Sequence, residues 1–239
     1  MRSCGRCRLG QAVPGRLAAD VPGRERLSMS EAAGTRPEVA SGPPEAARAR
    51  RADAARNERR LLEVARETFE REGVDASPES IAKLAGVGVG TLYRHFPTRR
   101  ALLAGVVAEE FTHLAVRADE LLGEPDLDAG GAVRRWLLEL VAAVSRFRGL
   151  SAQSAAIMAV EERVAAPCQA MHESFGRLVY RAKRAGTLRR DVSVEDLLLL
   201  SCSVAWAAEQ VQDGGAYADR LLVLALEGIE RDETIASSV

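Results

Sequence analysis

The side chains best suited to chemistry lie close together, at Thr91, Tyr93, Arg94 and His95. They supply a hydroxyl, a phenol, a guanidinium and an imidazole, and each of these groups can donate a hydrogen bond to a phosphate oxygen or a base edge. The cluster therefore indicates recognition of an anionic partner such as nucleic acid rather than catalysis.

Motifs of catalysis are missing from the same chain. It contains no Gly-rich phosphate loop, no HExxH and no GxSxG. Its three histidines, His95, His113 and His172, lack the spacing of a metal site. Cys4 and Cys7 form a CxxC without a second ligand pair nearby. We therefore expect no enzyme activity, no cofactor and no bound metal.

Two short helical patterns, joined by a glycine turn, position the cluster. Ser77 is a good N-cap for the first helix, and Gly86 lies in the turn. The second helix runs from about Val89 to His95 and is stopped by Pro97. This is the layout of a helix-turn-helix, in which the second helix enters the DNA major groove. We expect the inward-facing residues to be Leu61, Ala65, Phe69, Ile81, Leu84, Ala85, Leu92 and Phe96.

The second helix is so short that only its first turn can reach base edges. That places Val89, Gly90 and Thr91 on the floor of the groove, where Val89 and the Thr91 methyl group can contact thymine methyls. Because Gly88, Val89 and Gly90 offer almost no hydrogen-bonding side chain, we expect specificity to depend on methyl contacts, backbone groups and DNA shape. The alternative for Thr91 is that it mainly stabilises the helix.

Charge is distributed unevenly along the 239 residues. Residues 1–100 carry a net charge of +6 and residues 101–239 one of −7, against a total of −1. A basic half with the helix-turn-helix and an acidic half are typical of a DNA reader fused to a domain that does not bind DNA. No stretch reaches the roughly 18 apolar residues of a membrane span. The pattern of a secretory signal is also missing, so we expect a soluble, cytoplasmic protein.

Apolar periodicity predicts an all-α protein of about nine helices. Residues 1–44 are rich in Gly, Pro, Ala and Arg and are expected to be a disordered tail. Met29 offers a later start that would leave residues 1–28 untranslated, and the competing interpretation is a basic arm on DNA. Residues 45–97 form the helix-turn-helix domain. Residues 98–239 form a helical domain, with Thr98 capping its first helix and Pro167 opening a long helix.

Three stretches resemble the DNA-binding domain of TetR-type transcriptional regulators: residues 61–73, IAKLAGV at residues 81–87 and GTLYRHFP at residues 90–97. They fall in register over about residues 56–106. The resemblance implies phosphate contacts for Tyr93 and His95. Arg94 is a further candidate, and Ser77 and Arg99 lie at helix starts that favour a phosphate. Tyr93 could instead pack the domain, and His95 could be a buried structural imidazole.

The resemblance also implies how the protein works. It would be a repressor that binds a (pseudo)palindromic double-stranded DNA operator as a homodimer and is released by a small-molecule effector. The last two helices, about residues 194–212 and 217–229, would form the dimer interface, with Ser201, Ala205 and Ala208 allowing close approach. Alternatively, these helices only complete the core.

The effector cavity is expected among the helices of residues 98–185, and its ligand is expected to be small and largely apolar. Acidic residues such as Glu139 and Glu173 would instead favour a cationic ligand, and the alternative is that they only form a solvated face. The candidate lining residues are His113, Trp136, Phe147, Met158, Met171 and Phe175.

Two other functions stay open at this point. Cys168 or Cys202 could serve a redox-sensing regulator. The chain could also be a helical interaction protein that does not bind DNA.

Overall fold

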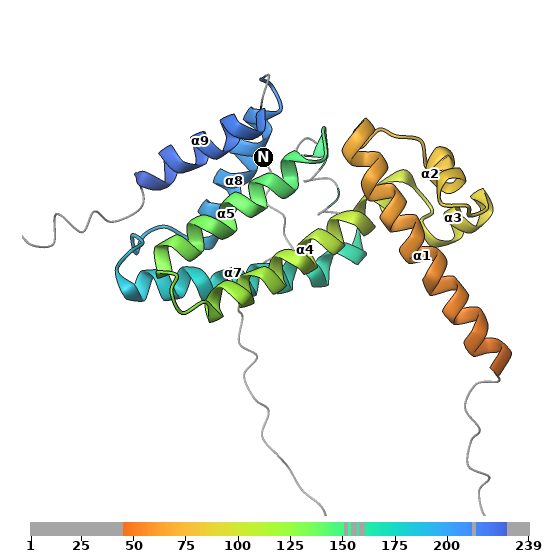
Figure 1. The fold of residues 1–239 in the computed structure, drawn as a ribbon, viewed down its shortest axis with the longest axis horizontal. Helices are drawn as coiled ribbons and strands as arrows, with labels where there is room; N and C mark the ends of the chain where they lie inside the picture. The colour runs from red at the N-terminus through yellow and green to blue at the C-terminus, as the bar shows by residue number, and fades with distance from the viewer. Residues whose placement is uncertain (1–44, 151–152, 154–156, 158–160, 212–213, 229–239) are drawn as a thin grey trace, which may run out of the picture. The chain divides into compact units, whose positions relative to one another are not determined.

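A computed structural model describes residues 45–150, 153, 157, 161–211 and 214–228. These residues form eight helices and no strand, so the predicted all-α class is confirmed (Figure 1). The predictions for the tail of residues 1–44, with Met29, Cys4 and Cys7, and for Met158 lie outside the described residues. By its internal contacts the chain divides after Asp53, and Ala54–Val239 is one unit. None of the described helices is long and apolar enough to cross a membrane.

The helix-turn-helix has the N-cap and the glycine turn expected from its sequence. α1 (Glu45–Glu72) ends at Gly73. α2 (Pro78–Leu84) starts after Ser77, whose side chain accepts a hydrogen bond from the Ser80 amide. Gly86 in the turn has φ 65°, a left-handed conformation that glycine adopts without strain. α3 (Val89–His95) follows, and its bounds agree with the prediction.

One hydrophobic cluster, here called the N-terminal cluster, joins these helices to the first half of α4 (Arg99–Gly123). α4 approaches α1 closely, because a methyl group on Gly105 would lie 2.6 Å from Leu62 Cδ2 and 3.1 Å from a Phe96 ring carbon. Four members come from much later in the chain, so the packing crosses the predicted boundary after residue 97. The cluster consists of Leu61, Leu62, Ala65, Phe69, Val74, Ala76, Ile81, Ala82, Ala85, Leu92, Phe96, Leu102, Leu103, Ala104, Val106, Val107, Phe147, Leu150, Ile157 and Val164.

The second half of α4 packs with the remaining helices, α5 (Ala129–Ser145), α7 (Glu162–Ala185), α8 (Val194–Ala208) and α9 (Gly214–Glu227). α4, α5 and α7 run side by side, and α8 and α9 cover α5 (Figure 1). Their shared core is here called the C-terminal cluster: Leu114, Ala115, Ala118, Leu121, Ala132, Val133, Trp136, Leu137, Leu140, Val141, Met171, Phe175, Leu178, Val179, Ala182, Leu188, Leu197, Val204, Ala205, Ala208, Ala218, Leu222 and Leu226.

The structure corrects several predicted details. Leu84 was expected to face inward but is 57% exposed, because Ala82 instead joins Ile81 and Ala85 in the core. α7 begins at Glu162, so Pro167 lies inside it rather than opening it. α8 ends at Ala208, before the predicted residue 212, and α9 already begins at Gly214.

Candidate nucleic-acid interface and effector cleft

The first turn of α3 is exposed, as its predicted role in the major groove requires. Val89 is 43% exposed, and Gly88 precedes it in an extended conformation without a side-chain cap. The Thr91 amide donates to the Gly88 carbonyl at 2.8 Å. Gly90 has no neighbour within 4 Å of the position that a Cβ would take. The tip therefore presents backbone, one valine and the half-buried Thr91, which agrees with the small reading surface inferred above.

Tyr93 is exposed on α3, and its hydroxyl donates a hydrogen bond to a Glu79 carboxylate oxygen on α2. Ser77 Oγ donates to the other oxygen, Glu79 Oε2, at 2.7 Å. These two bonds hold the pKa of Glu79 below its ordinary value, with the Tyr93 bond as the larger cause. The same bond raises the pKa of Tyr93. The phenol is thus already occupied by a carboxylate in the free protein.

His95 and Arg99 also face acidic groups. The side chain of His95 is only 16% exposed, and its Nδ1 lies 3.7 Å from Glu58 Oε2. The short α3 turns this last residue toward α1. Arg99 Nη2 lies 3.0 Å from Asp75 Oδ1, and its Nη1 donates to the Asp75 carbonyl at 3.1 Å.

The predicted phosphate-binding residues therefore lie on α3 and at the starts of α2 and α4. Ser77, Tyr93, Arg94 and Arg99 are all exposed there. Sequence reasoning missed their acidic partners, Glu58, Asp75 and Glu79. Glu79 carried a signal, since an acidic residue in a first helical turn commonly accepts local hydrogen bonds. Glu58 carried none, because it lies far from His95 along the chain.

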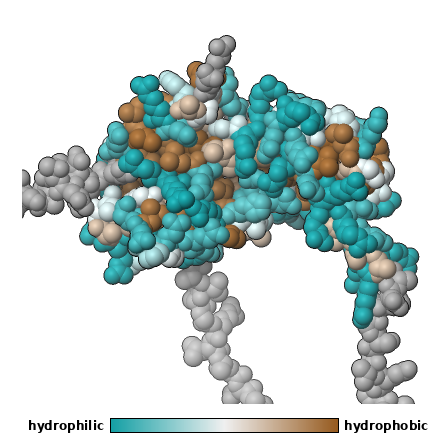
Figure 2. Space-filling view, in the orientation of Figure 1, coloured by the Kyte–Doolittle hydropathy of each residue, from teal (hydrophilic) through white to brown (hydrophobic). Residues whose placement is uncertain are grey.

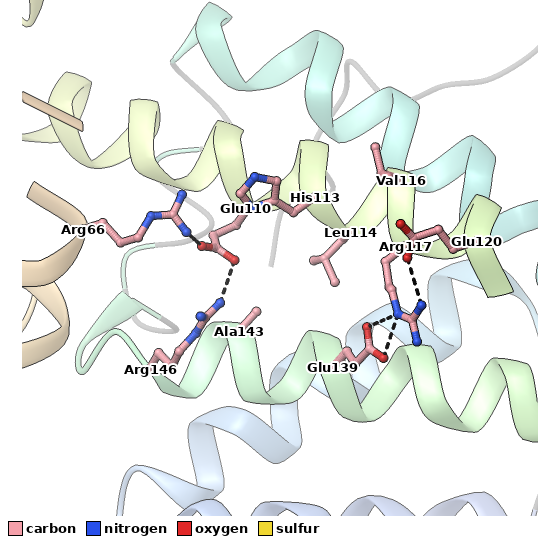
Figure 3. Close-up of a pocket in the computed structure, with 10 residues that line it drawn as sticks. All are labelled: Arg66, Glu110, His113, Leu114, Val116, Arg117, Glu120, Glu139, Ala143 and Arg146. Atoms are coloured by element: carbon pink, nitrogen blue, oxygen red, sulfur yellow. Dashed lines mark hydrogen bonds and ion pairs between the residues drawn. The ribbon is translucent and has the colours of Figure 1, made fainter. Parts of the chain in front are cut away.

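A cleft of about 400 Å³ opens between α1, α4 and α5 (Figure 3). Leu114 and Ala143 line it between two groups of ion pairs, and His113 and Val116 lie along α4 at its edge. The cleft is lined by Arg66, Glu110, His113, Leu114, Val116, Arg117, Glu120, Glu139, Ala143 and Arg146.

The ion pairs at one end of the cleft link α1 to α4 and to the residues that follow α5. The buried Glu110 of α4 accepts hydrogen bonds from Arg66 of α1 and from Arg146, which follows α5, the latter at 2.7 Å. At the other end, Arg117 Nη1 donates to Glu120 at 2.9 Å and Nε donates to Glu139 at 3.0 Å. A ligand in this cleft would contact α1, which belongs to the DNA-binding region, as well as α4 and α5.

The described residues that were predicted to line one effector cavity do not lie together around one cavity. His113 lines the cleft. Trp136, Met171 and Phe175 fill the C-terminal cluster, where the Trp136 and Phe175 rings stack with centroids 4.0 Å apart. Phe147 belongs to the N-terminal cluster instead. Large apolar side chains at helical spacing are more often core than ligand contacts, and these four are buried.

α8 and α9 expose an apolar surface. Figure 2 shows hydrophobic residues gathered at the surface over α9. The small residues expected at the interface do not lie on it: Ser201, Ala205 and Ala208 are buried within the chain itself, where they let α8 pack closely. The large exposed side chains on these two helices are Leu199, Trp206, Tyr217 and Leu224.

Cys202 is not part of a disulfide. Cys202 lies on the exposed side of α8, yet burial of its sulfur raises the pKa of the thiol. A raised pKa lowers the fraction of the reactive thiolate. The structure therefore adds nothing in favour of a redox sensor at Cys202.

Comparison with known proteins agrees with this architecture. Residues 61–106 match the family model described as bacterial regulatory proteins of the tetR family. Residues 128–231 match the C-terminal domain of transcriptional regulators like SbtR.

Two solved structures match over nearly their whole length. The TetR transcriptional regulator SCO0520 from Streptomyces coelicolor is 31% identical, with a TM-score of 0.55, covering 72% of this chain and 98% of that one. A TetR regulatory protein from Mycobacterium vanbaalenii is 32% identical, with a TM-score of 0.51, covering 76% and 99%. The chain therefore belongs to the TetR family of transcriptional regulators.

Curated relatives match over a shorter region. The HTH-type transcriptional regulator SAR0097 of Staphylococcus aureus is 34% identical over 80 residues, which is 32% of this chain. The chain spans 41% of the length of that relative. The matching proteins are transcriptional regulators rather than enzymes.

Proposed function

We propose that this protein is a repressor that binds a (pseudo)palindromic operator as a homodimer and is released by a small molecule. The exposed first turn of α3 carries the proposal, with Val89 at the tip and Tyr93 and Arg99 beside it. Val89, Gly90 and Thr91 read the groove. Tyr93, Arg94, His95, Ser77 and Arg99 bind phosphates, and Tyr93 and Arg99 exchange their carboxylate partners for them. Such a regulator acts in the cytoplasm, where the DNA is.

A second copy of the chain supplies the partner for α8 and α9. Leu199 and Trp206 lie two turns apart on α8, both more than half exposed, and Leu224 is similarly exposed on α9. An apolar strip of this kind on two adjacent helices fits a four-helix interface with its own copy. Two-fold pairing would set two recognition helices about 34–36 Å apart on successive major grooves.

The effector binds in the cleft between α1, α4 and α5. Its mixed lining, with Arg–Glu pairs at both ends and Leu114 and Ala143 between them, suits a polar ligand with an apolar middle rather than a purely apolar one. A ligand that displaced the Arg66–Glu110 bond would loosen α1 from α4. A compound that releases DNA equally from wild type and from a His113→Ala, Val116→Ala double variant would locate the effector elsewhere.

Selection of duplexes from a random library, followed by a salt-dependent gel shift, tests DNA reading. Wild type should enrich a two-fold symmetric sequence, and Val89→Ala should bind that sequence more weakly and less selectively. Enrichment of no sequence would leave a helical interaction protein as the better explanation. Equal binding by Val89→Ala would contradict the reading surface.

Light scattering tests the dimer at micromolar concentration. Trp206→Glu should give a monomer, because it buries a charge in the apolar strip. Tyr180→Glu changes an aromatic residue on α7 that is also more than half exposed, and it should leave a dimer. A monomeric wild type would contradict the proposal.

A further inference from the structure

α7 reaches the recognition helix through Arg163 in its first turn. Arg163 Nη1 donates a hydrogen bond to Glu58 Oε1 of α1 at 2.5 Å. Its guanidinium carbon lies 5.1 Å from the centre of the Phe96 ring. Phe96 is the C-cap residue of α3. One side chain of the C-terminal region therefore contacts both α1 and the end of α3.

Glu58 is shared between Arg163 and the recognition helix. While Oε1 accepts from Arg163, Oε2 lies 3.7 Å from Nδ1 of His95, the last residue of α3. The His95 and Phe96 rings lie beside each other, with centroids 6.3 Å apart. Arg163, Glu58, His95 and Phe96 thus form a continuous chain of contacts around one end of α3.

α3 depends on external contacts more than a long helix does. It has seven residues and no side-chain hydrogen bond at its N-cap, and helices this short are not stable by themselves. Its inward side is fixed by Leu92 and Phe96 in the N-terminal cluster. At its C-terminal end, the groups that fix it are those held by Arg163.

The same turn of α7 holds the start of α4. Glu161 Oε1 accepts a hydrogen bond from Arg100 Nε at 3.1 Å. Val164, one residue beyond Arg163, is buried in the N-terminal cluster. Two ion pairs and one apolar contact therefore hold the first turn of α7 against the DNA-binding region. A displacement of this turn would change the contacts that position α3.

We propose that Arg163 is a positioning residue for the recognition helix. Through Glu58 and Phe96 it fixes the end of α3, and hence the angle at which Val89 is presented, so that movement of α7 changes DNA reading. This inference rests on the proposed role of α3 as the DNA reader. A half-exposed ion pair together with a cation–π contact should shift the local opening of α3 by roughly fivefold to tenfold.

Amide hydrogen exchange of the free full-length protein tests the positioning role without DNA. Arg163→Ala should exchange roughly fivefold to tenfold faster at the α3 amides of Leu92 and Phe96. Arg163→Lys keeps the charge and should restore about half of the lost protection on a logarithmic scale. Arg177→Ala is the matched control, since Arg177 is an exposed arginine of α7 that pairs with Asp119 of α4. It should leave α3 unchanged.

DNA binding gives the second readout. The probes are a duplex enriched by wild type and a scrambled duplex of the same composition. Arg163→Ala should lose about fivefold affinity for the enriched duplex and less than about twofold for the scrambled one. A purely structural role would weaken both equally.

Three results would overturn the proposal: unchanged α3 exchange in Arg163→Ala, equally faster exchange in α8 and α9, or equal loss on both duplexes. If wild type enriches no duplex, DNA reading fails as a function. The exchange data then still decide whether Arg163 positions α3.

Discussion

The two hydrophobic clusters are built in different ways. The C-terminal cluster draws on residues 114–226 and has the stacked rings of Trp136 and Phe175 within it. The N-terminal cluster combines residues 61–107 with Phe147, Leu150, Ile157 and Val164. α4 contributes to both, and Phe111 packs against each. The DNA-binding region is therefore not self-contained, whereas the C-terminal cluster includes no described residue of α1 to α3.

The largest effect is expected in the C-terminal cluster. Trp136 is fully buried, stacks on Phe175 and donates from Nε1 to the Leu114 carbonyl at 2.8 Å. Trp136→Ala should lower the free energy of unfolding by about 4 kcal/mol, measured by chemical denaturation. Trp136→Phe keeps a ring on Phe175 and should cost less than half as much. Equal losses would assign the effect to the hydrogen bond rather than to packing.

The variant Phe147→Ala tests whether the stability of the N-terminal cluster depends on the segment that follows α5. Phe147 is fully buried there, so truncation should cost about 3 kcal/mol. Amide exchange should accelerate more in α2 and α3 than in α8 and α9. The opposite distribution would show that Phe147 mainly supports the C-terminal cluster, and would contradict the difference between the two clusters.

Two glycines provide a paired test of packing. Gly105→Ala should lower stability by about 1–3 kcal/mol, because its methyl group would collide with Leu62 and Phe96. Gly176 lies in α7 with open space at its Cβ position. Gly176→Ala should therefore raise stability by about 0.5–1 kcal/mol through helix propensity. Thermal unfolding of both variants measures the difference, and a stabilised Gly105→Ala would contradict the close approach of α4 to α1.

Glu79→Gln should strengthen DNA binding about threefold at low salt, since it removes a carboxylate that holds the Tyr93 hydroxyl and repels phosphate. Fluorescence anisotropy at several salt concentrations measures the change. Glu67→Gln removes the same charge from the exposed side of α1 and should change affinity less. Weaker binding by Glu79→Gln would mean that Glu79 orients Tyr93 for DNA rather than competing with it.

The smallest expected effect is on titration. The pKa of Glu79 is lowered in the folded protein, so its contacts stabilise the fold above the ordinary carboxyl pKa, and this contribution is lost as the pH falls through the lowered value. Tyr93→Phe should raise the pKa of Glu79 toward its ordinary value, as carboxyl NMR would measure. Ser77→Ala should raise it less, because the Ser77 bond is the smaller cause.

Local features of the fold could be predicted from the sequence. Ser77 and Thr98 cap helices where expected, and Gly86 lies in the turn between α2 and α3. These signals work because a cap is decided by a residue and its near neighbours. The helix-turn-helix and the exposed tip of α3 followed from the same local rules.

Features that depend on distant segments could not be predicted. Leu84 has the spacing of an inward residue, but which side of a seven-residue helix is covered depends on its neighbours. Phe147 and Trp136 look alike as apolar residues, yet they belong to different clusters. His95 and Arg163 lie far from Glu58 in the sequence, and both contact it only in the folded protein.

The late contributors to the N-terminal cluster limit how regulators of this kind can be recombined. A chimera that joined residues 1–107 to a foreign sensor would leave behind Phe147, Leu150, Ile157 and Val164, and with them part of the reader's own core. Exchange of sensors between family members would then require a donor with matching side chains at those four places. Whether a DNA-binding region and a C-terminal region are compatible thus depends on apolar side chains that lie well after the helix-turn-helix in the sequence.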